Sequence, residues 1–178
     1  MQNVSGRQAG VRWVVMGVSG CGKSTVGRDL AAALGCDYVE GDAFHQSASI
    51  AKMAAGVPLL DADRAGWLRA LQQQIGRARE HGTSLVLSCS ALRRAYRDLL
   101  READPALRFA HLDGPRELVA ARLAARTGHY MAPLLLDSQL ALLEPLGEDE
   151  AGVVLDLRHT PAELVEQISA SALQVWRA

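Results

Sequence analysis

The chain has 178 residues, of which 49% are hydrophobic and 22% charged, a composition and length that suit one ordinary globular domain. The formal net charge of −1 gives no basic excess that would suggest a nucleic-acid partner. No apolar stretch is long enough to span a membrane, so we expect no membrane partner. The cysteines lie far apart without metal-type spacing, and we interpret them as reduced thiols of a cytoplasmic protein (Cys21, Cys36 and Cys89).

Residues 1–10 are small and polar, so we expect a flexible N-terminal tail before a single domain at 11–178. In that domain, short apolar runs alternate with helix-like patterns. Strands are predicted at 12–18, 37–40, 84–88, 108–112 and 153–157, and helices at 24–34, 62–80, 91–103, 115–126, 133–143 and 161–176. This alternation predicts an α/β fold in which helices cover both faces of a parallel sheet.

Between the first strand and the first helix, residues 17–24 fit the phosphate-binding loop pattern G-x-x-x-x-G-K-[ST]. Glycines let the backbone fold around a phosphate, and the helix N-terminus favours anions. Lys23 is expected to reach the β- and γ-phosphates of ATP, and the Ser24 hydroxyl to bind Mg²⁺. The loop residues predicted to bind the nucleotide are Gly17, Ser19, Gly20, Cys21, Gly22, Lys23, Ser24 and Thr25. A glycine-rich turn that binds nothing is the alternative, and the strand–loop–helix context disfavours it.

The segment after the second strand offers groups for the acceptor of a phosphoryl transfer. Asp42 stands beside a glycine at the strand end, where its carboxylate could hydrogen-bond a hydroxyl and accept its proton. The alternative is an aspartate that caps a turn or helix. His45 could donate to a substrate oxygen or be structural. Residues 61–64 carry charges that suit a polyol or a carboxylate, although an aspartate there could simply cap the next helix.

A mobile lid is predicted around residues 122–135. Arg122 and Arg126 stand four positions apart on one helical run and so share a face. The segment that follows could carry arginine over the phosphates and exclude water. Lys23 and Arg126 would then stabilise the transferring phosphoryl group. The alternative is two solvated arginines at a helix C-terminus, where cations are favoured.

The metal site has one unusual feature in the sequence. The third predicted strand ends in Ser88 and not in the aspartate that conventionally supplies a second Mg²⁺ ligand. We therefore expect the metal to be held by Ser24, by phosphates and by water, with Asp42 contributing through water.

Sequence motifs that match one enzyme family run along nearly the whole chain, from Val14 to about Ile168. The longest are MGVSGCGKS at 16–24, EGDAFH at 40–45 and CSALRRAYRDLLR at 89–101, and shorter ones lie at 50–53, 56–64, 67–68, 122–123, 128–130, 138–140 and 143–145. Together they resemble the bacterial gluconokinases, which are small P-loop kinases. Several of these motifs are specific to that family.

The resemblance implies phosphorylation of D-gluconate by ATP to give 6-phospho-D-gluconate, carried out by a homodimer. It implies a P-loop fold related to shikimate kinase, with a five-stranded sheet ordered 2-3-1-4-5 and a helical lid. It places adenine near residues 158–160 and makes His159 and Arg122 nucleotide contacts. The acceptor-binding residues that it implies are Asp42, His45, Lys52, Asp63 and Arg64.

Three positions depart from the usual residues of the family. Gln46 and Gly66 stand where proline is usual, and Ser49 where asparagine is usual. Serine is shorter and lacks the amide donor, and losing a buried polar contact costs about 1–3 kcal/mol. Two alternatives therefore stay open: a P-loop kinase for another small hydroxylated acid, such as another sugar acid or shikimate, and a nucleotide-binding regulator without catalysis. A nucleic-acid kinase is disfavoured, because the chain has 4% aromatic residues and no basic run.

Overall fold

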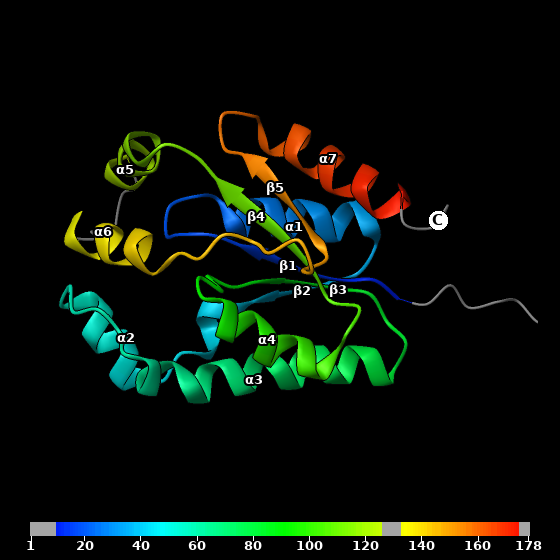
Figure 1. The fold of residues 1–178 in the computed structure, drawn as a ribbon, viewed down its shortest axis with the longest axis horizontal. Helices are drawn as coiled ribbons and strands as arrows, with labels where there is room; N and C mark the ends of the chain where they lie inside the picture. The colour runs from blue at the N-terminus through cyan, green and yellow to red at the C-terminus, as the bar shows by residue number, and fades with distance from the viewer. Residues whose placement is uncertain (1–9, 126–132, 175–178) are drawn as a thin grey trace, which may run out of the picture.

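Five parallel strands form the central sheet, in the order β2-β3-β1-β4-β5 (Figure 1). The computed structural model describes residues 10–125 and 133–174. The strands are β1 Arg12–Met16, β2 Asp37–Glu40, β3 Leu85–Ser88, β4 Arg108–Asp113 and β5 Gly152–Asp156. Each neighbouring pair runs in parallel, so the predicted strand order and direction are confirmed.

Helices cover both faces of this sheet. α1 and α7 lie on one face and α3 and α4 on the other, while α2, α5 and α6 gather beyond the end toward which the β4 arrow points (Figure 1). The helices are α1 Lys23–Leu34, α2 Ser47–Ala54, α3 Asp61–Glu80, α4 Arg94–Ala103, α5 Arg116–Ala124, α6 Pro133–Leu142 and α7 Pro161–Gln174. A parallel sheet has to be covered on both sides, and the predicted three-layer fold is confirmed.

The central strand β1 contributes to a hydrophobic core on each face of the sheet. Trp13 and Val15 pack with α1 and α7, whereas Val14 and Met16 pack with α3 and α4. Successive side chains of a strand point to opposite faces, which accounts for this division. All five residues of β1 are buried, as expected for a strand with neighbours on both edges and helices above and below.

Three helix boundaries follow directly from local sequence. Gly35 ends α1 with a φ of +61°, and Gly82 follows α3 with a φ of +65°, a conformation that favours glycine. At the start of α7, Glu163 Oε2 accepts the Thr160 N–H at 2.7 Å, and Thr160 Oγ1 accepts the Glu163 N–H at 3.3 Å. This reciprocal capping box fixes the beginning of the helix.

The segment between β3 and α4 differs from its prediction. α4 begins at Arg94, three residues later than the predicted helix at 91–103, because Ala91 has a φ of +43° that a right-handed helix excludes. A short 3₁₀ turn, η1 Gly41–Phe44, and the helix α2 were not predicted. Both elements are too short to establish a helical period in the sequence.

Two predictions fall on residues outside the described ones. They are the N-terminal tail, which lies almost wholly within 1–9, and the middle of the lid at 126–132, which includes Arg126. Both stay predictions. Across residues 10–125 and 133–174, no helix is long and apolar enough to cross a membrane.

Candidate active site

The phosphate-binding loop joins β1 to α1 and has a backbone that requires glycine. Gly17, Gly20 and Gly22 have φ angles of 139°, 82° and 98°, which residues with a side chain rarely adopt. A Cβ atom at Gly17 would also lie 2.7 Å from the carbonyl oxygen of Leu112. The loop leads directly into the N-terminus of α1, where anions are favoured, so the context that the motif needs is present.

A large cavity, here called the loop cavity, runs along this loop. Its lining includes Ser19, Gly20, Gly22, Lys23, Ser24, Thr25, Glu40, Asp42 and Arg122. The Lys23 ammonium donates to the carbonyl oxygen of Val18 at 3.0 Å and so lies within the curve of the loop. Of the predicted nucleotide contacts in the loop, Gly17 and Cys21 do not line this cavity, and Cys21 is buried. Burial raises the pKa of the Cys21 thiol despite the nearby Lys23.

Glu40, at the end of β2, is a functional candidate that the sequence analysis missed. Its Oε2 accepts a hydrogen bond from the Tyr38 hydroxyl at 2.8 Å, and its Oε1 accepts one from Ser88 Oγ at 2.6 Å. Burial disfavours the charged carboxylate, but hydrogen bonds from Ser88, Ser24 and Tyr38, together with the charge of Arg28, outweigh burial and lower the pKa of Glu40. An ionised carboxylate therefore stands beside the predicted metal-binding serine.

The chemistry of these donors fits Mg²⁺. The ion prefers oxygen ligands, and the loop cavity brings together the Ser24 hydroxyl and the carboxylates of Glu40 and Asp42. Within the described ranges, no three His, Cys, Asp or Glu side chains are placed to hold a metal ion by themselves. Phosphate and water oxygens would therefore have to complete the ligand set.

A second, smaller cavity, here called the side cavity, adjoins the loop cavity. Asp42, His45, Arg64 and Trp67 form part of its wall, and residues of α6 form another part. Asp42 lies in η1 with 65% of its side chain exposed, and its Oδ1 is 4.0 Å from Nε2 of His45. The residues that line both cavities are Ser19, Lys23, Asp42 and Met53. The predicted acceptor-side carboxylate and the loop lysine thus meet where the cavities join.

His45 is held against Trp67, which the sequence analysis did not assign to the site. The two rings stack with centroids 4.3 Å apart and planes inclined by 14°. Trp67 is itself fixed, because its indole N–H donates to the Gly41 carbonyl oxygen at 2.8 Å. Burial lowers the pKa of His45, with Asp42 opposing and Arg64 adding to the shift. The ring is therefore neutral near pH 7, and its buried Nδ1 has no partner among the described residues.

Comparison with known proteins identifies the family. The chain matches the AAA domain family over residues 13–146. It is 44% identical over 155 residues to the gluconokinase of Gluconobacter oxydans (strain 621H), covering 87% of each chain. It is also 38% identical over 168 residues to the thermosensitive gluconokinase of Escherichia coli (strain K12), covering 94% of this chain and 90% of the relative. The chain belongs to the gluconokinase family.

Solved structures agree with this gluconokinase assignment. The crystal structure of a gluconokinase from Sinorhizobium meliloti 1021 is 41% identical, with a TM-score of 0.86 over 94% of both chains. The shikimate kinase from Aquifex aeolicus vf5 has a TM-score of 0.59 at 16% identity, covering 94% of this chain and 99% of that one. At such low identity the likeness concerns the fold alone, and it agrees with the predicted relation to shikimate kinase.

Arg64 contributes a guanidinium to the wall of the side cavity of this gluconokinase homologue. It lies on α3 and is 9% exposed, with Nη1 donating to the Leu59 carbonyl oxygen at 2.6 Å and to the Tyr96 hydroxyl at 3.4 Å. An arginine stays charged when buried, and its remaining donors suit a carboxylate. This position is compatible with acceptor binding, which for Arg64 stays a prediction.

Lys52 and Asp63, which were also predicted to bind the acceptor, are not among the residues that line either cavity. The Lys52 ammonium donates to Asp63 Oδ1 at 2.7 Å, and Asp63 Oδ2 accepts the Leu60 N–H at 2.8 Å. Asp63 therefore caps α3, and the hydrogen bond from Lys52, followed by that cap, lowers its pKa. Neither side chain is part of the described cavity walls, so their role in acceptor binding stays a prediction.

The three departures from the gluconokinase pattern also lie outside the described cavity walls. Two of them face each other: a Cβ atom at Gly66 would lie 3.0 Å from the side-chain nitrogen of Gln46. Ser49 is buried, and its hydroxyl donates to the Asp63 carbonyl oxygen at 3.4 Å. The three positions lie where the start of α2 meets α3, and none of them is among the residues that line the side cavity.

Arg122 and His159 are predicted nucleotide contacts that lie outside the phosphate-binding loop. Arg122 donates to the Leu157 carbonyl oxygen at 2.7 Å and to that of Cys21 at 3.5 Å, so it links the phosphate loop to the segment after β5. His159, in that segment, lies on the surface with its Nδ1 3.7 Å from Glu163. Both positions are compatible with nucleotide binding, which for these residues stays a prediction, as it does for Arg126.

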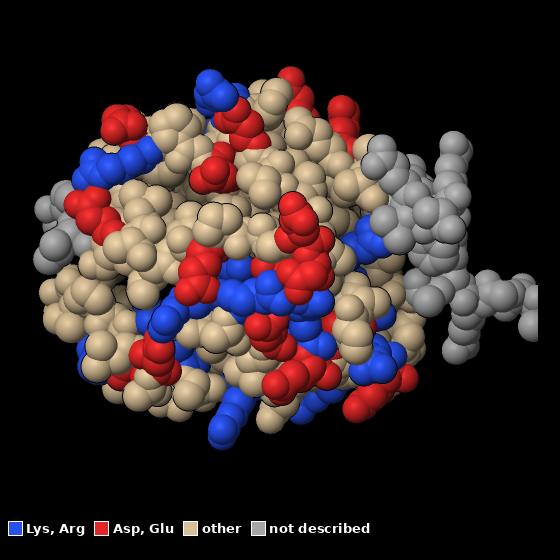
Figure 2. Space-filling model, in the orientation of Figure 1, with Lys and Arg blue, Asp and Glu red and all other residues tan. Residues whose placement is uncertain are grey.

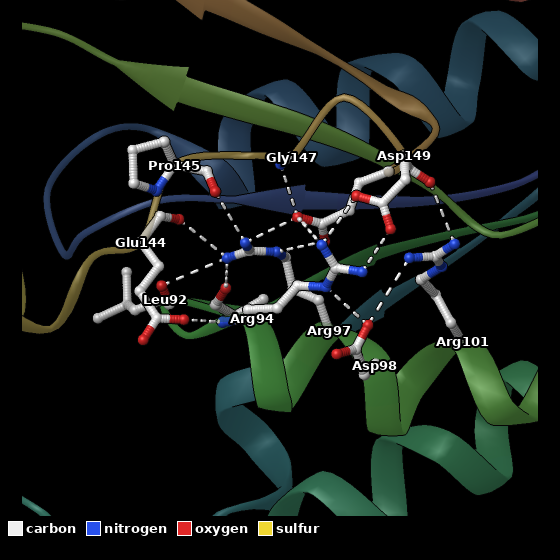
Figure 3. A network of polar contacts seen from close by, with 11 residues as sticks. Leu92, Arg94, Arg97, Asp98, Arg101, Glu144, Pro145, Gly147 and Asp149 are labelled. Carbon is white, nitrogen blue, oxygen red and sulfur yellow. Dashed lines mark hydrogen bonds and ion pairs between the residues drawn. The ribbon is translucent and has the colours of Figure 1, made fainter.

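A network of charged residues supports the β3–α4 segment that borders the side cavity. Basic and acidic side chains lie side by side across the middle of the face in Figure 2. Arg97 is fully buried. Its guanidinium donates to the Glu150 carboxylate and to four carbonyl oxygens, those of Ala91, Leu92, Glu144 and Pro145 (Figure 3). This single guanidinium therefore ties the segment after β3 to the segment after α6.

Proposed function

We propose that this member of the gluconokinase family phosphorylates D-gluconate to 6-phospho-D-gluconate with ATP. The observation that carries the proposal is the position of Asp42, whose side chain lines both the loop cavity and the side cavity. A carboxylate at that junction can hydrogen-bond an acceptor hydroxyl beside the terminal phosphate. The acceptor's identity is supported by relatives named gluconokinase at 38–44% identity.

The proposed transfer is a single displacement at the γ-phosphorus. The oxygen of the 6-hydroxyl forms a bond to the γ-phosphorus, the bond from that phosphorus to the β–γ bridging oxygen breaks, and ADP leaves. The hydroxyl proton passes to Asp42. Such transfers depend mainly on positioning and charge stabilisation, which Lys23 supplies from the phosphate loop. Arg126 is proposed to join it from the predicted lid.

Ser24 and Glu40 are the residues that would hold Mg²⁺ beside the phosphates, with Asp42 contributing through water. The serine supplies a hydroxyl ligand, and the two carboxylates supply negative charge next to it. When bound, the ion neutralises charge on the β- and γ-phosphate oxygens. The hydrogen bonds from Tyr38 and Ser88 hold the Glu40 carboxylate in one orientation for this role.

Arg64 and His45 are proposed to recognise the acceptor in the side cavity. The guanidinium of Arg64 suits the gluconate carboxylate, because a charge-assisted pair is stronger than a neutral hydrogen bond. The neutral ring of His45, fixed by stacking on Trp67, offers a nitrogen to one of the hydroxyls. Lys52 and Asp63 would support the acceptor site indirectly, because their ion pair joins α2 to α3.

We further propose that the protein is a cytoplasmic homodimer. The family resemblance of the sequence supports the dimer, and the three free cysteines support a reducing compartment. Light scattering coupled to gel filtration tests the dimer directly. A monomer at micromolar concentration would contradict it.

The test of the activity is an ADP-release assay with Mg²⁺ and ATP against D-gluconate, other sugar acids, shikimate and nucleoside monophosphates. We expect strong turnover on gluconate alone. Asp42→Asn should lower kcat by at least about 100-fold while changing ATP affinity little, since general-base catalysis contributes about 10²–10⁴-fold. Asp37→Asn, at an exposed carboxylate where β2 begins, is the matched control. Turnover on another acceptor, or ATP binding without turnover on any, would refute the proposed activity.

A further inference from the structure

Gln139 of α6 makes a two-point contact with the phosphate-binding loop. Its Oε1 accepts the backbone N–H of Ser19 at 2.7 Å, and its Nε2 donates to the Ser19 hydroxyl at 3.1 Å. A carboxamide presents its acceptor and its donor in one rigid plane, so the two bonds fix both the backbone and the side chain of Ser19. No motif in the loop itself indicates this partner, which lies 120 positions further along the chain.

The contact lies where the loop cavity and the side cavity join. Ser19 lines both cavities, and Gln139 lines the side cavity next to it. Under the proposed function, the terminal phosphate and the acceptor hydroxyl have to meet beside this residue. A displacement of about 1 Å at such a place can lower a transfer rate by about 100-fold. The position of Ser19 therefore bears directly on the reaction.

α6 is a firm support for this contact. Leu136 is 1% exposed and packs into the core on the α1 side of the sheet. Just beyond the helix, the Glu144 N–H donates to the Leu92 carbonyl oxygen at 2.7 Å, and the Glu144 carbonyl oxygen accepts a hydrogen bond from Arg97 at 3.0 Å (Figure 3). A side chain carried by a packed and anchored helix holds its partner more closely than one carried by a free loop.

We infer that Gln139 is a positioning residue for phosphoryl transfer, which holds Ser19 of the phosphate loop at the junction of the nucleotide and acceptor cavities. This inference rests on the proposed function and deepens it, because it assigns to α6 a part in the transfer itself. Gln139 does not line the loop cavity, where the nucleotide phosphates are expected. Its loss should therefore lower kcat without a comparable loss of ATP affinity.

The variant Gln139→Met tests this, because methionine keeps the length and helix propensity of glutamine but makes neither hydrogen bond. We expect kcat on gluconate to fall at least tenfold, while the dissociation constant of a non-hydrolysable ATP analogue changes less than threefold. Amide hydrogen exchange at Ser19 should become at least tenfold faster, with or without acceptor. Gln72→Met is the matched control, since it removes a similar bond, to the Leu99 carbonyl oxygen at 2.7 Å, between α3 and α4.

The outcomes separate the inference from the proposed function. Unchanged kcat and unchanged exchange in Gln139→Met would overturn the positioning role while the wild type still phosphorylates gluconate. A rise in KM for gluconate at constant kcat would also overturn it, because it would make Gln139 a direct acceptor contact. If the wild type fails on gluconate, the proposed function is lost, and the exchange rate at Ser19 still decides whether Gln139 holds the loop. The same fall in kcat in Gln72→Met would show a general structural effect and overturn the inference.

Discussion

Glu40 and Ser88 are paired at the carboxyl ends of β2 and β3, and Ser88 Oγ donates to Glu40 Oε1 at 2.6 Å. β3 ends in Ser88 and supplies no carboxylate at this place. The carboxylate beside Ser24 is that of Glu40, which comes from the neighbouring strand β2. The Ser88 hydroxyl orients the Glu40 carboxylate, and its hydrogen bond helps to lower the pKa of Glu40 against the effect of burial.

We expect Glu40→Gln to weaken Mg²⁺ binding about tenfold in the presence of nucleotide, because the change removes one negative charge beside the proposed metal site and keeps the shape of the side chain. A tenfold change corresponds to about 1.4 kcal/mol. Calorimetric titration of Mg²⁺ into the protein with ADP measures this without turnover. Glu80→Gln, at the exposed end of α3, is the control. An unchanged titration would remove Glu40 from the metal site.

The fold could be predicted from the sequence because its signals are local. Alternating strand and helix patterns, the phosphate-binding loop and the terminal glycines each act within a few residues, and Gly35 and Gly82 end their helices as expected. The strand order came from the family resemblance. The phosphate-binding loop was identified from its motif, and Asp42 from its position beside a glycine at the end of the second predicted strand.

The sequence analysis missed three site candidates, Glu40, Trp67 and Gln139, because each depends on a contact between distant parts of the chain. Glu40 becomes a candidate only once the register of β2 against β3 is known, and Trp67 only once α3 is seen to carry it under His45. Gln139 reaches Ser19 from α6. All three residues lie in motifs that carry the family resemblance, at 40–45, 67–68 and 138–140, but nothing in those motifs shows which contact each residue makes. The strand order that the resemblance implies, with β2 next to β3, could have drawn attention to Glu40.

A second prediction concerns Ala91, the buried residue with a φ of +43° in the segment between β3 and α4. Its carbonyl oxygen accepts a hydrogen bond from Arg97 at 3.2 Å, which holds the strained turn in place. Ala91→Val should lower the free energy of unfolding by about 3 kcal/mol, because a β-branched side chain resists this conformation and overfills the core. Urea denaturation measures the change.

Ala91→Gly is the matched control for that experiment. Glycine adopts a positive φ without strain, and the loss of one buried methyl group costs about 0.8 kcal/mol, so the net change should stay within about 1 kcal/mol. Equal destabilisation by valine and glycine would mean that packing alone, and not the backbone conformation, determines which residue is tolerated at this position.

A third prediction concerns pH. His111, on β4, is 4% exposed, and its Nε2 has no hydrogen-bond partner within the described part of the chain. Burial lowers its pKa, Asp113 opposes the shift and Arg97 adds to it. The unfolded chain therefore takes up a proton before the folded protein does, and stability is lost as pH falls from about 6.5 through the lower folded value.

His111→Asn should reduce this acid-dependent loss, because the substituted side chain does not titrate. The measurement is the free energy of unfolding from urea denaturation at pH 7.5 and 5.5, where the variant should show a smaller difference than the wild type. His81→Asn, at an exposed histidine after α3, is the control and should keep the wild-type difference. A pH dependence that His111→Asn leaves unaltered would assign the effect to other groups, of which His45 is the first to examine, since burial also lowers its pKa.

The last prediction uses the contact between Gln46 and Gly66. Gly66 lies within α3, where alanine is favoured over glycine by about 1 kcal/mol. The new methyl group would meet only the end of the Gln46 side chain, at 3.0 Å, and a flexible side chain can move aside. Gly66→Ala should therefore raise the free energy of unfolding by up to about 1 kcal/mol. In a Gln46→Ala background the gain should be larger, because nothing then has to move. A loss of stability in both backgrounds would mean that α3 needs glycine at this position for a reason other than the contact with Gln46.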